Sequence, residues 1–140
     1  MKKIMGVLIV VLALVIGIVP LFTDCLSQGR SLTTTDGKVV PMKCHWTAIA
    51  EIAAAIPLGL VGIFNIFSKR KESSTMLSVL GIALGTLVIL LPTTLIGVCA
   101  NPTMLCNMVM KPTLISAGGL SIAASLVVLG GSFKLVDATA

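Results

Sequence analysis

The sequence predicts an all-α membrane fold: an antiparallel bundle of four transmembrane helices in a single domain of residues 1–140, with a small β-hairpin in the first extracytoplasmic loop. Hydrophobic residues make up 56% of the chain and charged residues 11%, whereas soluble domains carry roughly 25% charged residues. The mean hydropathy is +1.12. A chain of 140 residues cannot bury this much apolar surface in its own core, so we expect a lipid bilayer to cover the remainder.

Four apolar segments supply the predicted helices, and each is close to the roughly 20 residues that a helix needs to cross the hydrocarbon core. They cover residues 4–22, 46–67, 76–98 and 112–133. The first is longer than the roughly 7–15 apolar residues of a signal peptide. No small-x-small cleavage site precedes Cys25, and Asp24 does not suit a lipoprotein signal. We therefore expect the first segment to remain in the protein as a span.

Single residues mark the other three spans. Trp46 opens the second span, where an interface anchor belongs. Pro57 lies inside that span, and membrane helices tolerate an internal proline when neighbours satisfy the freed carbonyl. Pro92 lies near the outer end of the third span, and Pro112 suits the first turn of the fourth.

Basic residues predict the orientation of the bundle. Six fall on one predicted side: Lys2, Lys3, Lys69, Arg70, Lys71 and Lys134. Four fall on the other: Arg30, Lys38, Lys43 and Lys111. Because short loops rich in Lys and Arg stay cytoplasmic, we expect both termini inside and the two cysteine loops outside. These residues lie at segment ends rather than along one face, so the net charge of +5 does not indicate nucleic-acid binding.

The first extracytoplasmic loop, residues 23–45, contains the predicted hairpin. Threonines and valines flank Asp36-Gly37, and an Asp-Gly pair between such residues is a strong hairpin signal. An isolated hairpin is marginally stable in water, so a bridge at its base is expected. The second extracytoplasmic loop is the shorter stretch from Cys99 to Cys106, with an Asn-Pro turn.

The four cysteines, Cys25, Cys44, Cys99 and Cys106, lie beside the outer ends of the spans. They allow three disulfide connectivities. The simplest scheme pairs Cys25 with Cys44 and Cys99 with Cys106, one bridge for each outward hairpin, and another scheme ties one hairpin to the other. Structural bridges suit an exported compartment. A reactive thiol pair is the alternative, although the chain has no CxxC motif.

Soft ligand atoms accompany the cysteines and suggest a metal-binding alternative. The candidate ligands besides cysteine are His45, Met42, Met104, Met108 and Met110. Thioether and thiolate sulfur favour Cu(I), but methionine is also an adaptable apolar filler. Because the donors match no specific metal motif, no cofactor is predicted.

Glu51 is an ionisable residue inside the second span, and such residues by default mark a function or a specific partner. Hydroxyls at a similar depth predict a polar layer around it, made of Thr47, Thr93, Thr94, Thr113 and Ser116. Glu51 is then a packing carboxyl bonded to those hydroxyls, a proton or cation site, or a contact with another membrane subunit.

Small residues recur at helix-packing intervals in three spans. Gly81 and Gly85 form a GxxxG pattern, Ala50 and Ala54 a second stripe, and residues 117, 121 and 125 a third. Such residues let helix backbones approach closely. They suit contacts within the bundle, with a membrane-protein partner, or in a homo-oligomer.

Two stretches carry a family resemblance: residues 42–47, which read MKCHWT and lead to Glu51, and residues 96–99 with 104–106. They resemble a family of small four-span prokaryotic membrane proteins catalogued as a domain of unknown function. The resemblance implies the four-helix architecture, a prokaryotic plasma membrane and extracytoplasmic cysteines. Neighbouring ABC-type export systems, which some members have, imply an accessory role.

Three functional hypotheses follow. The first is a non-enzymatic inner-membrane protein, an accessory or assembly subunit of a larger membrane complex such as an ABC-type exporter. The second is an extracytoplasmic soft-metal-binding or thiol-redox protein, and the third is a small carrier that uses Glu51. The chain has no phosphate-binding glycine loop and no catalytic nucleophile beside a base, and its single histidine excludes a two-histidine zinc site. A soluble type of enzyme is therefore not expected, and thiol-redox activity stays open.

Overall fold

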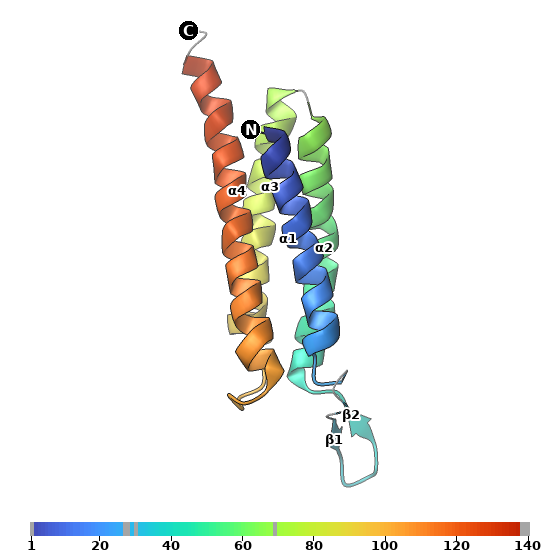
Figure 1. Ribbon diagram of the computed structural model, residues 1–140. Helices are drawn as coiled ribbons and strands as arrows, with labels where there is room; N and C mark the ends of the chain where they lie inside the picture. The colour runs from blue at the N-terminus through green and yellow to red at the C-terminus, as the bar shows by residue number, and fades with distance from the viewer. Residues whose placement is uncertain (1, 27–28, 30, 69, 138–140) are drawn as a thin grey trace.

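The computed structural model describes residues 2–26, 29, 31–68 and 70–137 as an antiparallel four-helix bundle with a small two-stranded sheet. The long helices are α1 (Lys2–Thr23), α2 (Lys43–Phe67), α3 (Lys71–Leu90) and α4 (Lys111–Asp137). All four, with the short turns that extend two of them, are long and apolar enough to cross a membrane. Helix α1 begins and α4 ends at one end of the bundle, and the sheet lies at the other (Figure 1). The predicted fold class is confirmed.

The two later spans begin earlier than the sequence predicted. Helix α3 begins at Lys71 rather than at residue 76, continues through a π-helical turn, η1 (Leu91–Leu95), and ends there rather than at residue 98. Helix α4 is preceded without a break by a second π-helical turn, η2 (Cys106–Met110). Cys106 therefore opens the fourth helix instead of ending a loop, which corrects the predicted start at residue 112.

Both π-helical turns occur beside prolines at the same end of the bundle. Pro92 lies in η1 and Pro112 follows η2, and proline offers no backbone N–H to the helical ladder. In each turn a backbone N–H reaches five residues back, from Ile96 to Leu91 and from Lys111 to Cys106. Extra residues of this kind interrupt α-helices frequently at functional sites.

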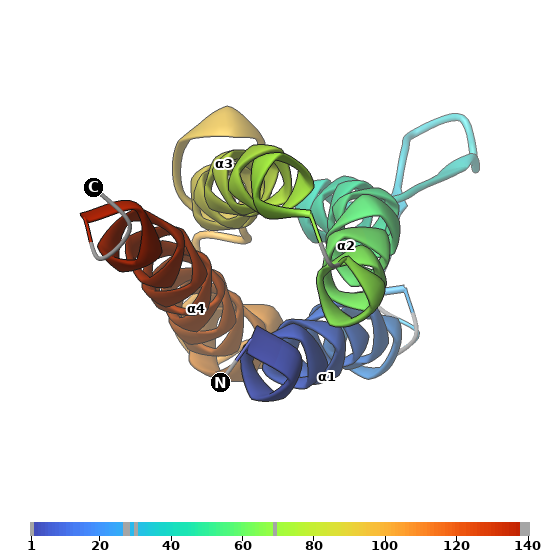
Figure 2. The same cartoon turned by 90° about the horizontal axis from the view of Figure 1, so that it is seen from above.

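Glycines set the closest helix contacts in the bundle. A Cβ at Gly62 would lie 3.0 Å from the carbonyl oxygen of Gly6, where α1 meets α2. A Cβ at Gly118 would lie 2.9 Å from the carbonyl oxygen of Gly85, where α4 meets α3. The Gly85 contact agrees with the close packing expected of the glycine stripe in the third span. Viewed from above, the four helices follow one another around a ring, so α1 also lies beside α4 (Figure 2).

The core runs along the bundle axis, while large apolar side chains also cover the outside. Ile9, Ile16, Leu58, Val88 and Leu114 are fully buried. The exposed set includes leucines on all four helices, together with isoleucines and phenylalanines on α1 and α2. A soluble protein rarely exposes so large an apolar surface, and a lipid bilayer is the solvent that suits it.

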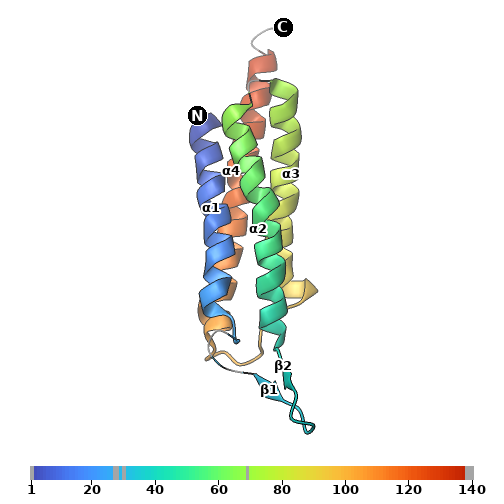
Figure 3. The same ribbon diagram turned by 90° about the vertical axis from the view of Figure 1, so that its right-hand side faces the viewer.

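The predicted hairpin is confirmed. Strand β1 (Leu32–Thr33) pairs antiparallel with β2 (Val39–Val40). Gly37 adopts φ +74° and donates its N–H to the Thr34 carbonyl at 2.8 Å, a turn that requires the left-handed conformation glycine accepts. The hairpin projects beyond the start of α2 (Figure 3).

Substitution of two adjacent glycines on α4 tests the close packing against α3. We expect Gly118→Ala to lower the free energy of unfolding by about 1–3 kcal/mol, because the added methyl group forces the helices apart. The matched control is Gly119→Ala, where an added Cβ meets no atom within 4 Å. Thermal unfolding of the purified protein in mild detergent, followed by circular dichroism, measures both. Equal midpoints for the two variants would show that the α3–α4 contact tolerates a methyl group.

Candidate functional site: a four-cysteine cluster

Four cysteine sulfurs converge at the end of the bundle that carries the hairpin, which we call the cysteine end. Cys25 follows α1, Cys44 lies in the first turn of α2, Cys99 follows η1 and Cys106 opens η2. All four Sγ atoms lie within 4.8 Å of one another. Cys99 is partly exposed and the other three are buried. The fold thus gathers into one cluster residues that are up to 81 positions apart in the chain.

Within the cluster a disulfide touches two free thiols. Cys25 and Cys44 form the disulfide, as predicted, and it closes the base of the hairpin loop. Cys99 and Cys106 are free, which corrects the predicted second bridge between them. The Cys106 sulfur lies 3.4 Å from that of Cys25. The Cys99 sulfur lies 3.3 Å from that of Cys44 and 3.5 Å from that of Cys25.

A hydrogen bond between α2 and the segment after η1 holds Cys99 near the disulfide. The Thr47 hydroxyl, one turn beyond Cys44 on α2, donates to the Gly97 carbonyl at 2.7 Å. Gly97 adopts φ +79° where the chain leaves η1, a conformation that costs other residues roughly 1–2 kcal/mol. The left-handed turn ends the third span and directs the next residues toward α2. Sequence reasoning placed Thr47 beside Glu51 and did not anticipate this bond.

An acid–imidazole pair flanks the disulfide. The Asp24 carboxylate accepts a hydrogen bond from Nδ1 of His45, with 2.8 Å between Oδ2 and Nδ1. Asp24 directly precedes Cys25, and His45 directly follows Cys44. The disulfide and the pair therefore share the same two backbone segments. Sequence reasoning used Asp24 only to argue against a lipoprotein signal, although its position beside Cys25 was visible.

The structure rearranges the predicted soft-metal ligands. Met42 is near the cluster, with its Sδ 4.0 Å from the Cys99 sulfur. Met110 is buried in the core, Met104 packs against that core, and Met108 is 63% exposed. His45 has its Nδ1 bound to Asp24. The four cysteine sulfurs, rather than these side chains, therefore form the convergent donor set.

Glu51 is fully buried two helical turns beyond Cys44 on α2. Neither carboxyl oxygen has a hydrogen-bond partner among the residues that the structure describes. Thr47, one turn away, is buried as well. An unpartnered polar group in an apolar core is costly, so this carboxyl is a feature that packing alone does not explain.

The other hydroxyls of the predicted polar layer do not reach Glu51. Thr93 and Thr94 are exposed and donate to carbonyls of their own helix, Ile89 and Leu90. Ser116 is exposed and donates to the Pro112 carbonyl, also on its own helix. Thr113 and Ser116 line a groove between α1 and α4. Thr47 donates to the Gly97 carbonyl, so none of the predicted hydroxyls bonds the Glu51 carboxyl.

The comparison with protein families identifies the family of this chain. A family described as a domain of unknown function, DUF4418, matches residues 2–130. The chain belongs to the DUF4418 family. Comparison with the curated proteins and with the solved structures gives no match. The resemblance inferred from the cysteines and the CHWT-like stretch is confirmed, and the family description assigns no activity.

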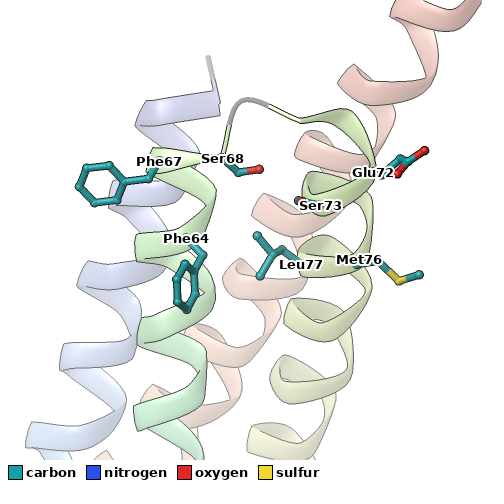
Figure 4. Close-up of a pocket in the computed structure, with 7 residues that line it drawn as sticks. All are labelled: Phe64, Phe67, Ser68, Glu72, Ser73, Met76 and Leu77. Atoms are coloured by element: carbon teal, nitrogen blue, oxygen red, sulfur yellow. The ribbon is translucent and has the colours of Figure 1, made fainter.

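A large groove of this DUF4418 chain lies at the end of the bundle opposite its cysteines. It has a volume of about 680 Å³ and lies between the last turn of α2 and the first turns of α3. Leu77 projects from α3 toward α2, whereas Phe67 and Glu72 point away from the gap (Figure 4). The groove brings together no set of reactive groups, so its size does not mark it as the chemical centre.

Removal of the Thr47 hydroxyl tests how Cys99 is held. We expect Thr47→Val, which keeps the shape but leaves the Gly97 carbonyl unpaired, to loosen the loop after η1, since such a loss costs about 1–3 kcal/mol. Cys99 should then react several-fold faster with a maleimide. Thr47→Ser keeps the hydroxyl and serves as the matched control. Equal labelling rates in wild type and Thr47→Val would contradict this role.

Proposed function

We propose that this DUF4418 protein is a membrane thiol–disulfide exchange protein that acts through its four-cysteine cluster. The observation that carries the proposal is the contact between one disulfide and two free thiols, with sulfur separations of 3.3, 3.4 and 3.5 Å. Two disulfides with separate structural roles would not need to lie in contact. Because the four sulfurs are in contact, small side-chain rotations can form other disulfide pairs among them.

The exchange step balances within the chain. The Cys106 thiolate attacks the Cys25 sulfur, a Cys25–Cys106 bond forms, and the Cys25–Cys44 bond breaks. Cys44 leaves with the electron pair and takes up the proton that Cys106 released. Exchange of this kind proceeds through the thiolate of the attacking cysteine. The product carries a bridge from α1 to η2 and a dithiol of Cys44 and Cys99.

Exchange at Cys99 is the step that matters for a partner. The Cys99 thiolate attacks the Cys44 sulfur, 3.3 Å away, a Cys44–Cys99 bond forms, and Cys25 leaves with the electron pair and takes up the proton that Cys99 released. A substrate dithiol then passes two electrons and two protons to the Cys44–Cys99 disulfide and becomes a disulfide itself, which leaves all four cysteines of the cluster as thiols. Cys99 is the most accessible of the four cysteines, so it is the contact point for that substrate. The predicted orientation puts the cluster in an extracytoplasmic compartment, where disulfides persist.

The cluster geometry favours this hypothesis over the other two inferred from sequence. A role as an accessory subunit of a membrane complex such as an exporter stays a prediction, as does a homo-oligomer. A carrier that uses Glu51 also stays a prediction, supported by the buried carboxyl without a partner. Neither hypothesis accounts for four converging sulfurs.

Removal of one disulfide partner tests the exchange. In Cys44→Ser we expect Cys25 to form a bridge with Cys106 or Cys99, because both sulfurs already lie within 3.5 Å of it. In wild type, a glutathione redox buffer should give a mixture of Cys25–Cys44 and Cys25–Cys106. Non-reducing peptide mapping of the membrane-inserted protein measures the pairings.

The double variant Cys44→Ser/Cys106→Ser is the matched control, since only Cys99 then remains in contact with Cys25. A Cys25 that stays open to alkylation in Cys44→Ser, together with a single pairing in wild type at every buffer ratio, would refute the exchange function.

Soft-metal binding by the reduced cluster is a second candidate function. A tetrahedral zinc–thiolate site has metal–sulfur bonds of about 2.3 Å, which place the sulfurs about 3.8 Å apart. The three distances between sulfurs that are not bonded to each other are a few tenths of an ångström shorter than this value. Four cysteines from different elements match a closed thiolate site, and the nearby Met42 sulfur adds a donor for Cu(I). The disulfide excludes this state, so metal and disulfide are competing uses of the same four atoms.

Metal titration after reduction tests the second function. We expect the fully reduced protein to bind one Zn²⁺ or Cu⁺ per chain without oxygen, and the disulfide form to bind none. Cys106→Ser should weaken binding by more than the roughly 10–100-fold typical of a lost outer-shell partner. Met108→Leu, at an exposed position, is the control. Equal metal content in reduced Cys106→Ser and wild type would exclude a four-cysteine centre.

A further inference from the structure

We propose that the pocket beside the disulfide binds a membrane-soluble quinone, which oxidises the Cys25–Cys44 dithiol. This inference rests on the thiol–disulfide function proposed above and names its electron acceptor. The pocket has a volume of about 310 Å³ and lies where the end of α1 meets the start of α2. That volume is at the lower end of the range for small-molecule sites.

The pocket combines apolar walls with one polar pair. Leu21 of α1 and Ile49 and Ile52 of α2 are among its apolar lining, and the Asp24–His45 pair is the polar part. Each member of the pair is one residue from a cysteine of the disulfide. A ligand in this pocket would therefore lie against the two backbone segments that hold the reacting sulfurs.

The pocket opens toward the surface that faces lipid. Leu21 is 56% exposed and Ile49 is 46% exposed, and both lie on the outside of their helices. Trp46, also exposed, is beside His45 at the start of α2, and tryptophans concentrate at the membrane–water interface. A molecule dissolved in the bilayer can enter sideways at this depth, whereas a folded protein substrate cannot.

Oxidation of a dithiol requires an acceptor for two electrons and two protons, and this sets the ligand class. A quinone is apolar enough for the walls, and its two carbonyl oxygens take up both the electrons and the protons. The Nδ1 atom of His45 is bound to Asp24, which leaves Nε2 for a carbonyl oxygen of the ring. The Asp24 carboxylate stabilises the imidazolium that forms when His45 holds a proton.

The reaction balances as follows. The S–H bonds of Cys25 and Cys44 break, the S–S bond forms, and two electrons pass to the quinone. His45 passes the proton of one thiol to a quinone oxygen. The proton of the other thiol is released to solvent, and a proton from solvent reaches the second quinone oxygen. The quinone becomes a hydroquinone. The restored disulfide is then ready for attack by Cys99 or Cys106.

A quinone oxidation assay tests the pocket. The full-length protein in lipid nanodiscs is reduced, freed of reductant without oxygen, and mixed with a fully substituted short-chain benzoquinone, which cannot add covalently to thiols. We expect one quinone to be consumed for each disulfide formed. Each variant is also oxidised with diamide. The rate of oxidation by quinone is divided by the rate of oxidation by diamide, so that a general loss of thiol reactivity does not change this ratio.

Two variants test the Asp24–His45 pair and the pocket separately. His45→Gln should lower the ratio by roughly 100-fold, as expected when an acid–base group is removed. Ile52→Trp should lower it by filling the pocket. Leu87→Trp, on the exposed face of α3 outside this pocket, is the matched control and should keep the wild-type ratio.

Three results would overturn the proposal in distinguishable ways. No quinone consumption by wild type, with diamide still restoring the disulfide, excludes the quinone site and leaves the exchange function intact. The same ratio in Ile52→Trp and wild type excludes this pocket as the place of reaction. If diamide too forms no disulfide among the four cysteines, the exchange function itself is refuted, and the quinone site with it.

Discussion

The covalent bond between Cys25 and Cys44 is the constraint on which the cysteine end depends. It joins the end of α1 to the start of α2 across 19 residues of sequence. Closing a loop of this size contributes about 3 kcal/mol through the entropy of the unfolded chain. The same bond anchors the exposed hairpin and fixes the backbone of Asp24 and His45. Any chemistry that breaks this bond therefore also changes the support of the loop and the pocket.

Helices α3 and α4 bring their cysteines to the Cys25–Cys44 disulfide through two irregular turns of backbone. The π-helical turns η1 and η2 flank the short loop that carries Cys99 and precedes Cys106. Regular helices would project their side chains at steps of 100° without interruption, and each π-helical turn inserts an extra residue that shifts this phase. The Thr47–Gly97 hydrogen bond then fixes the loop against α2. Two distant segments thus present their thiols to one disulfide.

Most of the fold could be predicted from patterns of residues close in sequence. The directions in which the helices turn their side chains could not be predicted in this way. The four spans, the hairpin at Asp36-Gly37 and the Cys25–Cys44 bridge each follow from residues close in sequence. The polar layer was wrong because equal depth along a helix does not give the direction of a side chain. Thr93 follows the buried Pro92 by one residue and is itself exposed. The contact of Cys106 with Cys25 likewise depends on packing between hairpins, which no local pattern contains.

Four consecutive residues at the start of α2 show how one helical turn organises the cysteine end. Successive side chains on a helix point about 100° apart, so Cys44, His45, Trp46 and Thr47 face four directions. Cys44 bonds Cys25, His45 binds Asp24, Trp46 is exposed, and Thr47 binds the Gly97 carbonyl. A single turn therefore links the end of α1, the exposed apolar surface of the bundle and the end of η1. A shift of the sequence by one residue along this helix would turn each of the four side chains away from the group or surface that it now meets. The contacts at the cysteine end therefore depend on these residue types in this order.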